Sequence, residues 1–525
     1  MLGVRVTRVM QRISSPVVYI CAVSLFAAAA LFFWQGWVDV SLWDEGFLWY
    51  GAQRFLYGDV PIRDFYAYDV GRYAVLAGFM WLWGNTGIIA LRFGLMFVQA
   101  AVLAGCTVYL YRRVTRQWVV IGGVMAVIIW WLWPLYRMPD FAVLVVALIT
   151  LARVQHNQLS ARQAFVAGLL YGLVLAAGGD LRKHGSFFVM SLVMVLVIRY
   201  IKYRQPRRWI RQGMYVLGGV IAGVSPLVLY VTLTPGLLQS YIQHMVVGFF
   251  ERDSANIPLP VPWPWLVSFQ DPLMGIRDLS IGMGFVALVF VPLALVTLLV
   301  RRAFAHRTVH PFVQGAVLYA LPSITYAFSR ADLVHLAQGA LPALLAGLVL
   351  VIQERPRWVK PILVCGSVIS AIIFWPVQPR QQCQLPNSCR ATQVGPDILS
   401  VPNQTADEIA LLIRMRNDFV ANDETLLIAP FWPGAYAMLG LEAPMWDIYA
   451  IWPRSDVQQR TEIARIATAA PRAIIVMNKG MDDRSALRFS LSHRLVYTYI
   501  LETYDQIRNY TTLPGYSIFR IRDYD

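Results

Sequence analysis

Long apolar stretches alternate with short polar ones over the first 376 residues. An apolar stretch of about 17–25 residues can cross a bilayer as a single helix. The run at 73–83 is too short for that, so we expect an amphipathic helix at the membrane interface there. The pattern predicts about eleven transmembrane helices, at roughly 16–36, 87–111, 118–134, 140–154, 163–178, 185–200, 213–233, 279–300, 311–328, 335–352 and 361–376. The connection 234–278 is expected to be a long loop.

From about residue 377 onward the apolar spacing becomes that of a soluble domain. The segment Thr405–Glu408 matches a capping box, which predicts a helix that opens there and runs to about Val420. The remaining pattern predicts buried strands at 425–429 and 472–477, a helix at 455–470, and closing antiparallel strands at 496–502 and 516–521.

Composition agrees with this division of the chain. The sequence is 58% hydrophobic and 14% charged, with a mean hydropathy of +0.53, whereas a soluble domain has about 25% charged residues. We therefore predict an α-helical polytopic membrane protein. Residues 1–376 form its transmembrane domain, and residues 377–525 form a small α/β domain outside the cytoplasm.

The net charge of +15 is concentrated on one side of the predicted membrane. The positive-inside rule makes that side cytoplasmic, so the N-terminus lies inside and the C-terminal domain outside. This distribution explains the basic charge without a nucleic-acid partner. Twenty basic residues carry it, with Glu354 the one acid among them: Arg5, Arg8, Arg12, Arg112, Arg113, Arg116, Arg153, Arg162, Arg199, Lys202, Arg204, Arg207, Arg208, Arg211, Arg301, Arg302, Arg307, Arg355, Arg357 and Lys360.

Charged clusters interrupt the apolar sequence at the opposite, outer ends of the predicted spans. Ionisable groups at that depth are unfavourable unless they are paired or used. One alternative is ion pairs that fix helix ends. The other is a site for a lipid-borne substrate, with a carboxylate as base and cations to neutralise a departing phosphate. The clusters are Asp44/Glu45, Arg137/Asp140, Arg182/Lys183/His184 and Arg330/Asp332/His335.

The first outer loop resembles a known family over roughly residues 1–110. Its motifs are Trp43-Asp44-Glu45-Gly46 directly after the first span, then Arg54 to Pro61, Asp64-Phe65-Tyr66 and Tyr68 to Tyr73. They are similar to the first loop of the GT-C glycosyltransferases, in the bacterial branch related to protein O-mannosyltransferases and the lipid A aminoarabinose transferase.

This resemblance implies a catalytic acid in the loop, a polyprenyl-phosphate sugar donor and a soluble outer C-terminal domain. Asp44 matches the catalytic position and is expected to be the general base, with Glu45 holding the loop or serving as the reserve base. The alternative for Asp44 is a helix cap, since Asp is a favoured N-cap residue. Expected substrate-binding residues are Asp69, Arg72, Arg137 and Asp140, and a phosphate site of Arg182, Lys183, His184, Arg330 and His335.

Other functions stay open at this point. A ligase that moves a whole lipid-linked glycan would need the same base and cations, and a transporter or flippase of lipid-linked saccharides would need a central cavity. The acceptor is a glycan, a lipid or a protein. We expect no required cofactor, and leave a divalent metal as an alternative. Cys383 and Cys389 lie in a polar loop outside the cytoplasm by this topology, so we expect them to form a disulfide.

Overall fold

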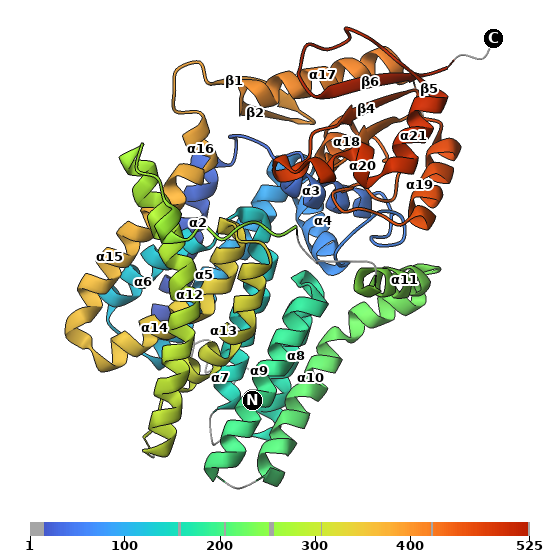
Figure 1. Cartoon of the computed structure of the whole chain (residues 1–525). Helices are drawn as coiled ribbons and strands as arrows, with labels where there is room; N and C mark the ends of the chain where they lie inside the picture. The colour runs from blue at the N-terminus through green and yellow to red at the C-terminus, as the bar shows by residue number, and fades with distance from the viewer. Residues whose placement is uncertain are drawn as a thin grey trace. The chain divides into compact units, whose positions relative to one another are not determined.

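The computed structural model describes residues 15–155, 159–203, 206–250, 257–305, 307–421 and 424–522 (Figure 1). Four of the basic residues used for the topology prediction, Arg5, Arg8, Arg12 and Arg204, lie outside these ranges. The chain divides into two compact units. The first unit contains residues 15–33, 95–229 and 257–378, and the second contains 34–94, 230–250 and 379–522, as far as they are described. The second unit therefore combines the C-terminal domain with two segments from the sequence-predicted transmembrane domain 1–376.

Eleven helices occupy the positions of the predicted spans. They are α2 (Ser15–Gln35), α5 (Ile88–Arg113), α6 (Trp118–Trp131), α7 (Met138–Val154), α8 (Ala161–Gly178), α9 (Leu181–Tyr203), α10 (Pro206–Leu233), α12 (Pro272–Phe304), α13 (Pro311–Ser329), α14 (Leu333–Glu354) and α15 (Pro356–Phe374).

Among the described residues, nine helices are long and apolar enough to cross a membrane. The helix α6 has only 14 residues, and α13 is outside this group although it has 19. The count of eleven spans is thus not confirmed. The interior of α13 carries Ser323 and Thr325 and is largely buried in its unit. A helix that faces protein instead of lipid needs no continuous apolar surface.

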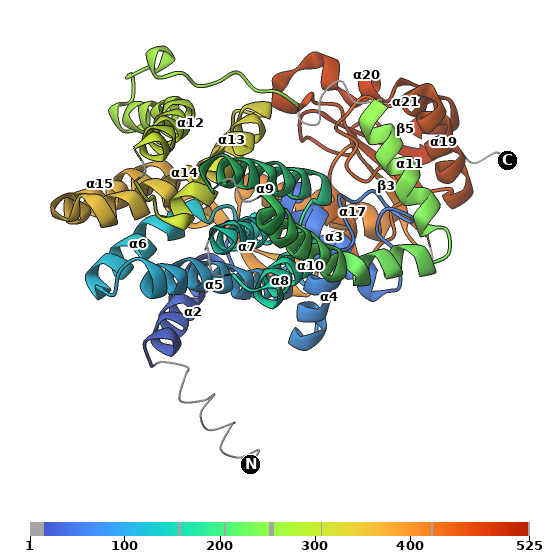
Figure 2. The same cartoon turned by 90° about the horizontal axis from the view of Figure 1, so that it is seen from below.

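Small residues set the close packing of α8 against α10, which lie side by side in both views of the chain (Figures 1 and 2). A Cβ atom on Gly168 would lie 2.0 Å from the carbonyl oxygen of Val216, and one on Gly172 would lie 2.4 Å from that of Val220. Glycines at this spacing let membrane helices approach backbone to backbone.

The second unit is built on a four-stranded sheet with the order β3-β4-β6-β5. Strands β3 (Leu426–Ala429) and β4 (Ala473–Met477) are parallel, while β6 (Tyr516–Ile521) is antiparallel to both β4 and β5 (Tyr504–Gln506). The helices α17 (Asn403–Phe419), α18 (Pro433–Leu439), α19 (Asp456–Ala469) and α21 (Arg494–Thr503) belong to the same unit. Its core contains Leu427, Ile474, Ile500 and Phe519, all at most 1% exposed.

Most predicted elements of this unit are confirmed, with three corrections. The predicted strand 496–502 is wrong, because these residues form helix α21, which buries Val496 and Ile500 one turn apart on one face. The helix α17 begins at Asn403, so Thr405–Glu408 lies inside it and does not open it. The predicted loop 234–278 contains helix α11 (Leu237–Phe250) and the start of α12.

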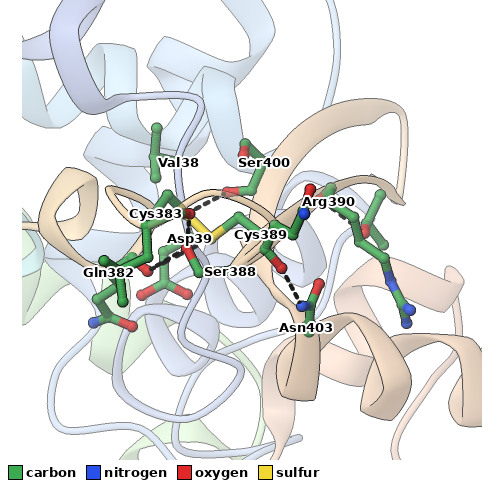
Figure 3. Close-up of a disulfide and its surroundings, with 12 residues drawn as sticks. Val38, Asp39, Gln382, Cys383, Ser388, Cys389, Arg390, Ser400 and Asn403 are labelled. Carbon is green, nitrogen blue, oxygen red and sulfur yellow. Dashed lines mark hydrogen bonds between the residues drawn. A yellow bond between two sulfur atoms is a disulfide. The ribbon is translucent and has the colours of Figure 1, made fainter.

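A hairpin that the sequence pattern did not indicate precedes α17. Its strands are β1 (Cys389–Val394) and β2 (Asp397–Pro402), and Cys383 and Cys389 are joined by a disulfide at its base (Figure 3). The amide of Asp39 donates to the carbonyl of Ser400 at 2.8 Å, and the amide of Ser400 donates to Trp37 at 2.9 Å. The hairpin thus pairs with the first outer loop within the second unit.

Candidate functional site

Asp44 and Glu45 form the first turn of helix α3 (Asp44–Leu56) in the second unit. The N-cap residue is Trp43, so the alternative in which Asp44 caps a helix starting near Gly46 is wrong. Both carboxylates lie at the positive end of the helix dipole, which favours negative charge. The two side chains are in different surroundings.

Glu45 is buried in an ion pair with Arg92. The guanidinium donates Nε to Oε1 and a terminal nitrogen to Oε2, both at 2.7 Å. Arg92 also donates to the backbone carbonyls of Gly36 at 2.6 Å and Asp39 at 2.8 Å. A bidentate pair with further carbonyl partners fixes the guanidinium and the loop around it. Glu45 therefore holds the loop in place.

Asp44 is half-buried and accepts a hydrogen bond from the hydroxyl of Tyr449 at 2.6 Å. The Tyr449 ring lies 5.2 Å from the ring of Phe47, in a cluster that also contains Tyr66 and Tyr68. Aromatic packing of this kind gives the Asp44 carboxylate a fixed position. The Tyr449 hydroxyl therefore orients Asp44, whereas Arg92 binds Glu45.

Gly46 lies where the C-terminal domain contacts the Asp44-Glu45 motif. A Cβ atom at Gly46 would lie 2.6 Å from the Cα atom of Gly434, at the start of α18. The amide of Gly434 donates to the carbonyl of Leu42 at 2.9 Å. Helices α3 and α18 thus touch backbone to backbone, so the position after Asp44-Glu45 has no room for a side chain.

Asp69 and Arg72 lie at the start of helix α4 (Gly71–Trp83), the predicted short helix at 73–83. The Asp69 carboxylate accepts from the Arg72 Nε at 2.6 Å and from its backbone amide at 3.1 Å. The two residues are 2% and 5% exposed. This geometry stabilises the helix start, and their role in substrate binding stays a prediction.

In the first unit, three of the four predicted charged clusters come together at the N-termini of α7, α9 and α14. Asp140 of α7 is 1% exposed, and its Oδ1 accepts from Lys183 Nζ at 3.0 Å and from His184 Nε2 at 2.9 Å. Lys183 also donates to the side-chain oxygen of Gln338 at 3.2 Å. A terminal nitrogen of Arg137 lies 4.0 Å from the other oxygen of Asp140.

Two further carboxylates cap the converging helices. Asp180 accepts from the backbone amide of Arg182 at 2.9 Å, and this cap places Arg182-Lys183-His184 in the first turn of α9. Asp332 accepts from the backbone amide of His335 at 2.9 Å and caps α14. Burial acts to raise the pKa of Asp332, but the hydrogen bond and charge of His335 outweigh it, and the pKa is lowered.

The same residues form one connected network. Asp332 pairs with Arg330 at 2.9 Å and with the His335 ring nitrogen Nδ1 at 2.7 Å. The ring of Tyr326 lies 4.7 Å from the ring of His335. Lys183 Nζ lies 4.2 Å from the centre of the Tyr326 ring. On the far side His184 Nδ1 is 3.1 Å from the Tyr319 hydroxyl.

Charge and exposure divide the predicted phosphate site, together with Arg137 beside it, into two groups. His335, 6% exposed and bonded to Asp332, belongs to the inner group. Lys183 and His184 are inside, bonded to Asp140, with side chains 13% and 4% exposed. Arg137, Arg182 and Arg330 are more exposed, at 20%, 30% and 20%. With the histidines counted as neutral, Lys183 and the three arginines carry four positive charges. The carboxylates of the network, Asp140, Asp180 and Asp332, carry three negative charges. With three helix N-termini beside them, the arrangement favours an anion.

Sequence reasoning missed several partners in both units. Arg92 was detectable as a lone charge inside the apolar span 87–111. Tyr319, Tyr326 and Tyr449 carried no such signal, because tyrosines are common in apolar helices and loops. Among the residues that the structure describes, no group of three or more His, Cys, Asp or Glu side chains is placed to hold a metal ion.

Comparison with known proteins places the fold. No protein-family model matches the chain, and no curated protein matches its sequence. A crystal structure of ArnT, the lipid A aminoarabinose transferase, from Cupriavidus metallidurans bound to undecaprenyl phosphate is similar over 96% of this chain and 97% of that chain, with a TM-score of 0.55 and 12% identity. The chain has the GT-C fold. The fold expected from the first outer loop is therefore confirmed.

A second solved structure with this type of fold is the Archaeoglobus fulgidus oligosaccharyltransferase in its apo form. It matches 97% of this chain and 75% of its own, with 9% identity and a TM-score of 0.45.

Proposed function

We propose that this GT-C chain is an integral membrane glycosyltransferase that moves a sugar from a polyprenyl-phosphate donor to an acceptor outside the cytoplasm. The observation that carries the proposal is the different environment of the two carboxylates in the α3 first turn. The Glu45 carboxylate is paired with Arg92, whereas Asp44 is half-buried and oriented by the Tyr449 hydroxyl. The fold supports the same activity, since the similar ArnT structure holds undecaprenyl phosphate.

Asp44 acts as the general base. It removes the proton from the acceptor hydroxyl as that oxygen attacks the anomeric carbon of the donor sugar. The bond from this carbon to the phosphate oxygen breaks, and polyprenyl phosphate leaves with its electron pair. A phosphate is already a good leaving group, so one base is enough. Tyr449 keeps the carboxylate pointing in one direction during this step.

Arg137, Arg182 and Arg330 are the groups that contact the donor phosphate in this proposal. Guanidinium groups suit phosphate because they donate two parallel hydrogen bonds. Lys183 and His184, expected from the sequence to bind phosphate directly, instead hold Asp140 and keep α7, α9 and α14 together. We assign these two residues a positioning role, and their direct contact with the phosphate stays a prediction. The proposed reaction uses no cofactor.

The orientation follows from the basic residues of the loops. The N-terminus is cytoplasmic and residues 377–525 are outside, in a bacterial inner membrane. A phosphatase fused to the C-terminus is expected to be active, and a fluorescent protein fused there to be dark. The reverse pair of results would contradict the orientation and place Asp44 on the wrong side for the reaction.

The activity is tested with purified chain in lipid nanodiscs and a panel of synthetic polyprenyl-phosphate sugars. Release of polyprenyl phosphate is measured with and without candidate glycan, lipid and protein acceptors. We expect acceptor-dependent release, lost on Asp44→Asn. Transfer of a multi-sugar glycan would indicate a ligase. Movement of an intact lipid-linked sugar across the bilayer without release would indicate a flippase and contradict the proposal.

A further inference from the structure

The second unit contains a pocket that includes neither the proposed base nor the proposed phosphate-binding residues. Its volume is about 260 Å3. The walls come from the first outer loop around Arg63, from α11, from the segment 446–455 and from α19. This volume lies just below the range of about 300–1,000 Å3 found for pockets that hold drug-sized ligands. It suits one small polar group, and a polyprenyl chain would not fit.

Helix α19 supplies one wall of the pocket. Ser455 caps this helix in a capping box with Gln458, which fixes its first turn. Thr461, Glu462 and Arg465 follow along the pocket wall. Glu462 is 6% exposed, and one of its oxygens accepts from the backbone amide of Trp446 at 2.8 Å. The wall thus carries a carboxylate, a guanidinium, an amide and a hydroxyl, and the carboxylate and the amide are held in fixed positions by their backbone contacts.

The charges around the pocket are largely balanced. A terminal nitrogen of Arg454 donates to Asp447 Oδ1 at 3.0 Å, and both side chains are at most 8% exposed. Arg63 forms an ion pair with Asp64 at 2.8 Å. These pairs remove two of the three arginine charges that an anion site could use, and leave Arg465 beside Glu462 on the wall. The walls instead offer paired donors and acceptors to an uncharged ligand.

An apolar surface lies among these polar groups. Trp446 is half-buried, and its indole nitrogen donates to the carbonyl of Ile62 at 2.8 Å. The ring is therefore held in one orientation. A pocket with an aromatic surface and fixed bidentate polar side chains matches the chemistry of a sugar ring, which has C–H faces and neighbouring hydroxyl pairs.

The pocket and Asp44 share one aromatic framework. The Trp446 and Tyr66 ring centres are 5.3 Å apart, and those of Tyr66 and Phe47 are 5.8 Å apart. Phe47 packs on Tyr449, whose hydroxyl binds Asp44. A ligand in the pocket is thus held by the same packed group of side chains that positions the base.

We propose that this pocket binds a neutral sugar unit of the acceptor. The proposal rests on the proposed function, because it assigns the bound sugar to the acceptor of that reaction. It makes the acceptor a glycan or glycolipid and gives the C-terminal domain a part in acceptor choice.

Binding is measured on the full chain in lipid nanodiscs by saturation-transfer NMR and titration calorimetry. The probes are methyl glycosides of common hexoses and N-acetylhexosamines, and inorganic phosphate. Thr461→Trp fills the pocket, and Arg465→Ala removes one wall group. Arg460→Ala is the matched control, since Arg460 is an exposed arginine on the same helix outside the pocket lining.

We expect at least one glycoside to bind, tenfold or more weakly in the two pocket variants and unchanged in Arg460→Ala. The proposal is overturned if no glycoside binds, if Thr461→Trp binds as the wild type does, or if only phosphate binds. Asp44→Asn separates the two proposals. Loss of transfer with sugar binding kept supports both, whereas normal transfer with sugar binding kept rejects the base and leaves the pocket standing.

Discussion

Removing the Glu45 carboxylate is expected to destabilise the second unit and to affect transfer only through that loss. Glu45 is 7% exposed and Arg92 is 5% exposed, and the two are joined by a pair of 2.7 Å hydrogen bonds. In Glu45→Gln the side-chain shape stays, but Arg92 keeps a buried positive charge that has lost its bonded carboxylate, with Asp39 and Asp397 as the remaining nearby acids. The carbonyls of Gly36 and Asp39 still accept from the guanidinium.

The size of the effect follows from the burial of the pair. Breaking a buried ion pair by removing one partner destabilises by about 3–5 kcal/mol, because the remaining charge is left uncompensated. Removing both charges in the double variant Glu45→Gln/Arg92→Met is expected to cost less than the sum of the single changes. The coupling in such a cycle is about 0.5–3 kcal/mol for residues in contact.

The loss of stability is measured by thermal unfolding in nanodiscs and by limited proteolysis of the first outer loop. The expected result is a lower Tm and faster cleavage near residues 36–45 in Glu45→Gln, with partial recovery in the double variant. An unchanged Tm in Glu45→Gln with complete loss of transfer would contradict a structural role and make Glu45 the catalytic group.

Three other outcomes are expected. Arg182→Ala and Arg330→Ala should each weaken binding of a polyprenyl-phosphate sugar about tenfold with little change in Tm, and unchanged affinity in both would remove the phosphate site. Gly46→Ala should destabilise by about 1–3 kcal/mol because its Cβ meets the α18 backbone, whereas Gly78→Ala, with open space around it, should not. Burial and the nearby Asp447 charge raise the pKa of Glu462 from 4.5 to about 7, so the folded state holds a proton that the unfolded chain releases, and stability falls as the pH rises through this window. Glu462→Gln should flatten this fall between pH 5 and 8, and an equal fall in both proteins would contradict the assignment.

Much of the fold could be predicted from the sequence because the patterns that indicate it are local. Apolar stretches marked the helices of the first unit, and the outer charged clusters marked the helix N-termini that carry Asp140, Lys183 and His335. That these clusters meet could be expected from topology alone, since all were assigned to one membrane face. Their pairing could not, because which cation takes Asp140 depends on the packing of α7 against α9.

Other features depend on long-range contacts that leave no local pattern. Arg92 binds a carboxylate 47 positions earlier in the chain, and Tyr449 binds one 405 positions earlier. The segment 496–502 is rich in β-favouring Val, Tyr and Ile, yet it forms a helix because one face packs into the core beside Phe519. Local propensity predicted a strand there, whereas tertiary packing determines the helix.

The role of Asp44 as general base is tested by comparing the transfer rates of purified Asp44→Asn and Tyr449→Phe variants with matched Tm. Asn keeps the shape and can still accept the Tyr449 hydrogen bond, but it cannot take a proton at neutral pH. Loss of a general base lowers the rate by about 100-fold to 10,000-fold. We predict a loss of this size in Asp44→Asn and a smaller loss in Tyr449→Phe, which removes only the orienting bond. Near-normal transfer by folded Asp44→Asn would show that Asp44 is not the general base.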